Sequence, residues 1–386
     1  MIAYNKQTLD NLAVKEQTAA ALRRQLITTE EATAVGQAYP VNFYTPNPVI
    51  RIGLFILTVI ILLAALGLFL LMGASSSESA IRGMLLAVGI CSYIALEVLV
   101  RSNHYYHAGI DDALLWVALL LIGITIGFES HMSPAALYLI AAVLTGMATL
   151  RFADMILAGI SYLSLVMLMV YTIIQTGLGS STVVPFAVML FSAGVYFVAK
   201  RLTSLHICRH YKNCLIVVEV LSLVTLYMSG NYFVVREGGQ ALLGTELQPG
   251  QDIPAGWFFW IFSGGIPLAY IWAGIRRKDV VLLRTGLLLI AAIVFTIRYY
   301  HHILPLEDVM VLGGILLTGG AWLLIRYLRT PRQGFTYEET DEALLADKLN
   351  VESLVIAQTY TPVTPTPPDV TFGGGTGGGG GASGNY

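Results

Sequence analysis

The sequence predicts an all-α polytopic membrane protein, a bundle of about ten transmembrane helices with short loops. Charged residues make up only 12% of the 386-residue chain, whereas a soluble domain carries roughly 25%. Hydrophobic residues make up 56%, and the mean hydropathy is +0.70. These residues come in runs of bilayer length, and in lipid such a run satisfies its own backbone hydrogen bonds as a helix.

Ten apolar runs are long enough to cross a bilayer. The stretch from Ser133 to Gln175 is too long for one span, and Arg151 with Asp154 indicates a tight turn between two. The predicted spans are 49–73, 80–100, 112–128, 133–149, 152–175, 182–200, 214–235, 256–275, 280–297 and 308–328.

Basic residues predict the orientation of these spans. All but three of the 22 Lys and Arg residues fall on the terminal segments and on alternate loops, and the exceptions are Arg82, Arg236 and Arg298. Because cytoplasmic loops collect Lys and Arg, both termini are expected in the cytoplasm. The first 48 residues do not resemble a signal peptide, so the first span is expected to act as an uncleaved insertion signal.

The flanks of the transmembrane domain (49–328) are predicted to be cytoplasmic. Residues 1–48 read as a helical hairpin, in which Thr28 and Glu31 form a capping box that opens the second helix. Residues 329–360 contain an amphipathic helix, and residues 361–386 form a Pro/Thr linker and a disordered Gly-rich tail. These flanks either only cover the cytoplasmic face or dock a protein partner.

Three charged residues lie three or more positions inside the ends of predicted spans: Glu97, Glu219 and Arg284. Charges within a bilayer are costly and are therefore candidates for function. In one interpretation they pair and hold the bundle together, and Arg101 lies four residues after Glu97, a spacing at which helix neighbours meet. In the other, they line a cytoplasm-facing polar cavity, in which the glutamates bind protons or cations and Arg284 is the counter-charge.

A candidate helix break lies in the eighth predicted span, at Gly264, Gly265 and Pro267. Transporters use discontinuous helices to expose backbone groups to substrate near the membrane midplane. Glycine and proline are also common in membrane helices, where they produce a kink or close packing.

The stretch "NHYYHAGIDDALLW" (103–116) gathers titratable side chains at the start of the third span. Its tyrosines suit an aromatic belt, and Asp111 and Asp112 suit the positive end of a helix dipole. Partners for a metal site would come from His206, Cys208 and His210, but their spacing matches no zinc signature. We therefore predict no metal and no other cofactor.

Composition and motifs narrow the function classes. No basic domain indicates a nucleic-acid partner, and no G-x-S-x-G, H-E-x-x-H or P-loop motif occurs. The sequence favours a non-enzymatic scaffold or sensor, or a transporter of an unidentified small solute. The alternative is a membrane-embedded enzyme with a cytoplasm-facing site, in which His104, Asp111 and His206 would converge. The bilayer itself is the one partner that the composition requires.

Both ends of the chain carry elements of a known pattern. One is "ALRRQLITTEEATAVGQAY" before the first span, and the other is the F-x-x-RY element in "FTIRYYHHILPLEDVMVLGG", before a last span that stops in arginines. In these elements the chain resembles a family of bacterial predicted membrane proteins of unknown function. The resemblance is confined to the two ends. It implies a multi-span protein of the bacterial inner membrane and supplies no activity and no catalytic residue.

Overall fold

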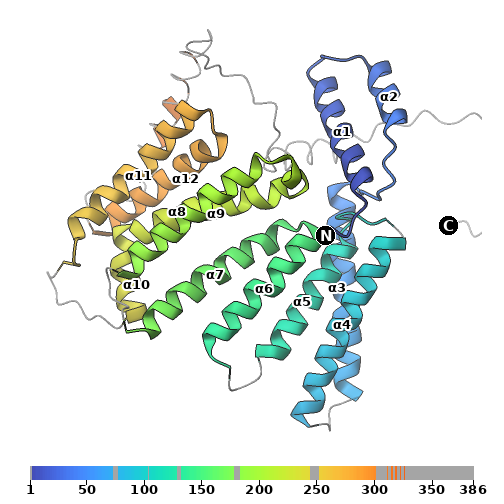
Figure 1. Ribbon diagram of the computed structural model, residues 1–386, viewed down its shortest axis with the longest axis horizontal. Helices are drawn as coiled ribbons and strands as arrows, with labels where there is room; N and C mark the ends of the chain where they lie inside the picture. Colours follow the sequence, from blue (N-terminus) through green and yellow to red (C-terminus); the bar gives the residue numbers. More distant parts are fainter. Residues whose placement is uncertain are drawn as a thin grey trace, which may run out of the picture. The chain divides into compact units, whose positions relative to one another are not determined.

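The computed structural model describes residues 2–72, 77–102, 104–127, 132–177, 183–243 and 252–300, with single positions between 311 and 326. Within these residues the ordered elements are twelve α-helices and one short 3-10 helix, with no strand beyond an isolated bridge (Figure 1). The predicted all-α class is therefore confirmed. The predicted span 308–328 lies almost wholly outside the described residues, and the predicted helix and tail that follow it lie entirely outside.

The helices begin and end at the following residues: α1 Lys6–Arg23, α2 Thr29–Ala38, α3 Pro48–Met72, α4 Glu78–Ser102, α5 Ile110–Gly127, α6 Pro134–Phe152, α7 Met155–Gln175, α8 Val183–Thr203, η1 His206–Tyr211, α9 Lys212–Gly230, α10 Tyr232–Leu243, α11 Gly256–Arg277 and α12 Val280–Tyr300.

Nine segments in the described part of the chain are long and apolar enough to cross a membrane, by length and composition. They are α3 to α8, η1 with α9, α11 and α12, and each corresponds to one predicted span. The predicted turn between the fourth and fifth spans is confirmed, because α6 ends at Phe152 and Asp154 caps α7 by accepting a hydrogen bond from the Leu157 amide. The capping box of Thr28 and Glu31 is confirmed as well.

The end of the seventh span differs from the prediction. We expected the helix to continue to Val235, but α9 ends at Gly230. The Asn231 side chain accepts hydrogen bonds from the amides of Phe233 and Val234, so it starts a new helix, α10. Apolar residues continue through this junction, and hydropathy alone therefore does not detect it.

Neighbouring helices pack mainly as sequential pairs: α4 with α5, α6 with α7, α8 with α9, and α11 with α12. Close approach within the last pair depends on Gly274, because a Cβ there would lie 2.7 Å from the Leu283 amide nitrogen. This is closer than atoms of neighbouring helices approach, so glycine is required at this position.

Several connections meet at one end of the bundle, which we call the basic end. The Ala3 amide donates to the Arg151 carbonyl, and the Tyr44 amide donates to the His104 carbonyl. Asp10 of α1 pairs with Arg209 of η1, and Lys200 at the end of α8 pairs with Asp279 before α12. The N-terminal segment and four inter-helix connections, 104–109, 153–154, 204–211 and 278–279, therefore share this end.

Candidate functional site

The first residues of the chain form an arm, residues 2–5, that is buried in the basic end. Tyr4 is only 6% exposed. Its ring packs edge-on against Tyr106, with centroids 4.9 Å apart, and against Phe43 and Phe152 at 6.1 and 6.4 Å. Such aromatic packing contributes beyond the burial of area. The arm thus attaches the α1–α2 hairpin to the ends of the spans.

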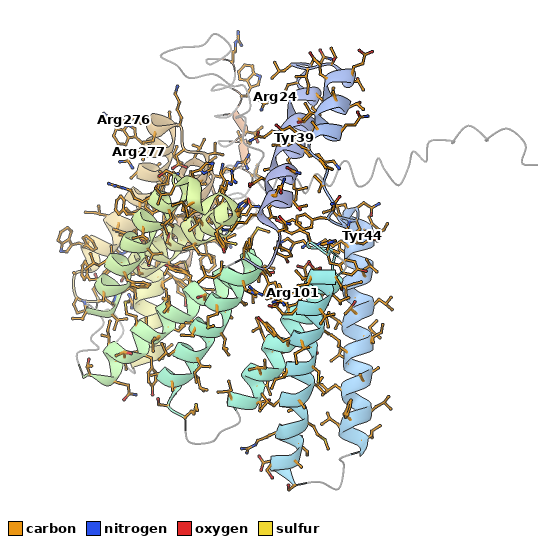
Figure 2. All side chains as sticks on the ribbon, turned by 45° about the vertical axis from the view of Figure 1, so that its right-hand side comes forward. Arg24, Tyr39, Tyr44, Arg101, Arg276 and Arg277 are labelled. Carbon is orange, nitrogen blue, oxygen red and sulfur yellow. The ribbon has the colours of Figure 1, made fainter. Side chains whose placement is uncertain are left out.

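The hairpin beyond this attachment is largely exposed. Leu9 is the buried residue of α1, and α2 has none. Figure 2 labels Arg24 and Tyr39 on the hairpin, and Tyr44 and Arg101 close to the arm's attachment. Both Arg24 and Tyr39 are exposed.

An ionic cluster lies beneath the arm. Asp112, in the first turn of α5, accepts from Arg51 of α3 at 2.7 Å and contacts His107 Nδ1 at 2.9 Å. We expected the two aspartates to stabilise the helix dipole, and they do occupy the first turn. The ionic contacts to α3 and to the preceding loop were not foreseen. We call Tyr4, Arg51, His107, Asp111 and Asp112 the arm site.

Asp111 closes the loop that precedes α5. Its Oδ1 accepts hydrogen bonds from the amides of Ala108 and Gly109 at 2.8 and 3.1 Å. Its Oδ2 is buried, with no hydrogen-bond partner in the described residues. Gly109 has φ of +97°, and a Cβ there would lie 2.2 Å from the Arg51 carbonyl oxygen, so only glycine fits.

Burial and charge shift the pKa values of the arm site. Burial alone would lower the pKa of His107, but the hydrogen bond and charge of Asp112 outweigh it and raise the pKa above its ordinary value. Burial, with the charge of Asp111, raises the pKa of Tyr4 well above 10.0. Burial likewise raises the pKa of Tyr106 to about 12. Both tyrosines are therefore neutral, and His107 keeps its proton to a higher pH than a free imidazole does.

Glu97 on α4 is bound by an arginine of another helix. Arg151, at the end of α6, donates from Nε to Oε1 and from Nη2 to Oε2, both at 2.9 Å. Arg101 approaches at 3.6 Å, as the helical spacing predicted, and Tyr93 donates at 3.3 Å. This two-pronged geometry is the strong form of a carboxylate–guanidinium contact.

Glu219 on α9 has a different environment. It is 1% exposed, and the Thr203 hydroxyl donates to its Oε1 at 2.7 Å. Lys200 lies 3.6 Å from Glu219 and only 2.8 Å from Asp279. We call Lys200, Thr203, Glu219 and Asp279 the lysine site. The third predicted residue, Arg284, lies on α12, five positions after Asp279.

The predicted intramembrane residues therefore belong to two sites. Arg151 of α6 contacts Glu97, whereas Lys200 of α8 contacts Glu219, so the two glutamates have different partners. Whether either one binds a proton or a cation stays a prediction.

The candidate helix break is a continuous helix in the structure. α11 runs through Gly264, Gly265 and Pro267 without interruption, and Pro267 is buried. A Cβ at Gly286 of α12 would lie 3.0 Å from the Pro267 carbonyl oxygen. Close packing of α11 and α12 therefore involves Pro267 and Gly286, whereas a Cβ at Gly265 would meet no atom within 4 Å.

The histidines of η1 are held by neighbours. Arg209 contacts His206 at 3.2 Å and pairs with Asp10, which His210 also approaches at 3.4 Å. Cys208 is a free thiol. Across the described ranges, no group of three or more His, Cys, Asp or Glu side chains could hold a metal ion.

Comparisons with protein-family models, with curated proteins and with solved structures find no match. The resemblance at the two ends of the chain thus gains no support from a family model. What is shown is a membrane protein with many apolar helices.

Proposed function

We propose that the chain is a non-enzymatic scaffold or sensor of the bacterial inner membrane, with the α1–α2 hairpin as its cytoplasmic interaction element. The observation that carries the proposal is the buried arm. Tyr4 inserts among aromatic side chains of the α4–α5 connection and of α6, so a rearrangement of those spans is transmitted to the hairpin. The hairpin in turn exposes most of its surface to the aqueous side.

The intramembrane charges support the same proposal. A scaffold needs its buried charges paired, because an unpaired ion in the bilayer is costly. Glu97 has Arg151, and Asp112 has Arg51. Paired and partly buried ions of this kind stabilise the bundle without carrying a solute.

Glu219 favours a second candidate, a small-solute transporter. Its closest donor is a neutral hydroxyl, and its lysine is shared with Asp279. A carboxylate with an incomplete set of cations is suited to take up a proton or a cation. A transporter requires a hydrated path that reaches this residue.

Cysteine accessibility separates the two candidates. After removal of Cys91, Cys208 and Cys214, single cysteines replace Ser92 and Ser222. Ser92 is 3% exposed and lies five residues before Glu97, and Ser222 is 0% exposed and lies three residues after Glu219. Serine-to-cysteine exchange preserves volume and leaves both glutamates in place. The reagent is a membrane-impermeant thiol label, applied from each face in turn.

The scaffold proposal predicts protection at both interior positions from both faces. Labelling at Ser222→Cys would establish a hydrated path and favour the transporter. Labelling at both positions from the cytoplasmic face alone would favour the membrane-embedded enzyme. Glu78→Cys and Arg277→Cys are the controls, and they must label from opposite faces, with Arg277→Cys on the cytoplasmic one.

A further inference from the structure

A groove of about 400 Å³ lies between α8 and α9. Figure 1 shows these two helices side by side, and they make extensive contact. The groove's walls are apolar and include Leu190, Val198 and Leu202 of α8, with Leu215 and Val218 of α9. Leu190 and Val198 are 78% and 58% exposed, so the groove opens on the outer surface of the two helices.

The floor of the groove exists because one side chain is missing. Gly194 lies one helical turn from both Leu190 and Val198, so all three share a face of α8. A Cβ at Gly194 would meet no heavy atom within 4 Å. The glycine therefore leaves open space between two exposed apolar side chains.

An exposed cation, Arg201, lies at the basic end of the groove. Arg201 follows Val198 by three residues and Gly194 by seven, which puts it on the same face of α8. It is exposed and forms no ion pair with a carboxylate in the part of the chain that the structure describes. Lys200, in contrast, contacts Asp279.

We propose that this groove binds an anionic phospholipid, with an acyl chain along Gly194 and the headgroup phosphate at Arg201. Both helices are long and apolar enough to cross a membrane, so the groove faces acyl chains. Cations at a membrane surface attract anionic headgroups. A helix of a partner protein is about 10 Å across with its side chains, so it is too wide to enter a depression left by a single missing side chain.

The test uses the full chain, purified in detergent and freed of lipid. Phosphatidylglycerol or phosphatidylcholine is titrated into the micelles, and native mass spectrometry counts the lipids bound. We expect saturable binding of phosphatidylglycerol in preference to phosphatidylcholine. Inorganic phosphate at the same concentration should not compete, because the acyl chain supplies much of the affinity.

Two variants test the two parts of the site. Arg201→Gln should weaken binding of phosphatidylglycerol about fivefold, the loss expected for one cation beside an anionic headgroup. Gly194→Phe should abolish saturable binding of both lipids, because the ring fills the groove. The matched controls are Gly123→Phe, a helical glycine that also has open space, and Arg82→Gln, at the opposite end, and both should bind like the wild type.

The proposal is overturned if the wild type binds both lipids equally, if Gly194→Phe binds like the wild type, or if inorganic phosphate competes. A Gly194→Phe protein that loses a dimer mass instead of lipid would show that a second copy occupies the groove. The melting temperature without lipid should match the wild type, which confirms that the variant folds.

Discussion

The arm site and the lysine site both hold buried carboxylates at the basic end, but they differ in how many cations each carboxylate contacts. In the arm site, Asp112 has two positively charged or chargeable partners, Arg51 at 2.7 Å and His107 at 2.9 Å. The ring of Tyr4 lies 6.4 Å from the ring of His107. In the lysine site, one lysine serves two carboxylates, and its side chain is 44% exposed, nearly the same as the 43% of Arg51.

This difference predicts that the two clusters contribute differently to stability. Removing one member of a buried ion pair leaves an uncompensated charge, so a carboxylate held by two such partners is costly to neutralise. A carboxylate whose closest donor is a hydroxyl loses less when it becomes neutral. We therefore expect a larger loss of stability when Asp112 is neutralised than when Glu219 is.

The largest expected effect comes from removing the Tyr4 side chain of the arm site. Tyr4→Ala should lower the free energy of unfolding by about 3 kcal/mol, as for other buried aromatic side chains. Thermal unfolding in detergent measures this loss. Trypsin should also cut faster at Arg23 and Arg24, because the hairpin loses its attachment. Tyr39→Ala, at a 47% exposed tyrosine of the same hairpin, is the control and should change neither.

A second pair of variants compares the two sites directly. Asp112→Asn should cost about 2 kcal/mol, because it leaves Arg51 and His107 without their carboxylate. Glu219→Gln should cost less than about 1 kcal/mol, since the amide oxygen still accepts from Thr203 and Lys200 keeps Asp279. Equal losses in chemical denaturation would remove the distinction between the sites.

A smaller effect should appear as a pH dependence. Because the folded-state pKa of His107 is raised, its contribution is fully present below the ordinary value of 6.5 and is lost as pH rises through the raised value. The melting temperature of the wild type should therefore fall over that interval, and His107→Gln should remove this part of the fall. A wild-type curve that rises there would contradict the assignment.

The smallest effect is expected at Asp111, next to the sensitive Asp112. Asp111→Asn keeps an oxygen for the amides of Ala108 and Gly109 and replaces an oxygen that has no partner in the described residues. It also removes a negative charge beside Asp112. The change in unfolding free energy should stay below about 1 kcal/mol, well under that of Asp112→Asn.

Local patterns predicted much of the fold. Bilayer-length apolar runs gave the nine spans that the structure describes, and the Thr28–Glu31 spacing gave a cap. The end of α9 escaped prediction because the determinant is one side chain, Asn231, that also donates to Tyr227 and Thr296. Because the residues on both sides are apolar, hydropathy does not reveal this polar junction.

The sites were less predictable, because they depend on which helices are neighbours. Glu97 and Arg151 are 54 residues apart, and Arg51 and Asp112 are 61 apart. The sequence identifies each charge as costly in a bilayer but not its partner. Tyr4 carried no signal at all, since a tyrosine in a polar N-terminal segment has no periodicity that indicates burial.

The central claim is that the buried arm fixes the hairpin to the spans. Spin labels at Ala13→Cys on α1 and Leu205→Cys beside η1, both exposed, allow the distance between them to be measured by double electron–electron resonance in a protein without native cysteines. The account predicts a narrow distance distribution in the wild type and a broad one after Tyr4→Ala. Distributions of equal width in the two proteins would contradict it.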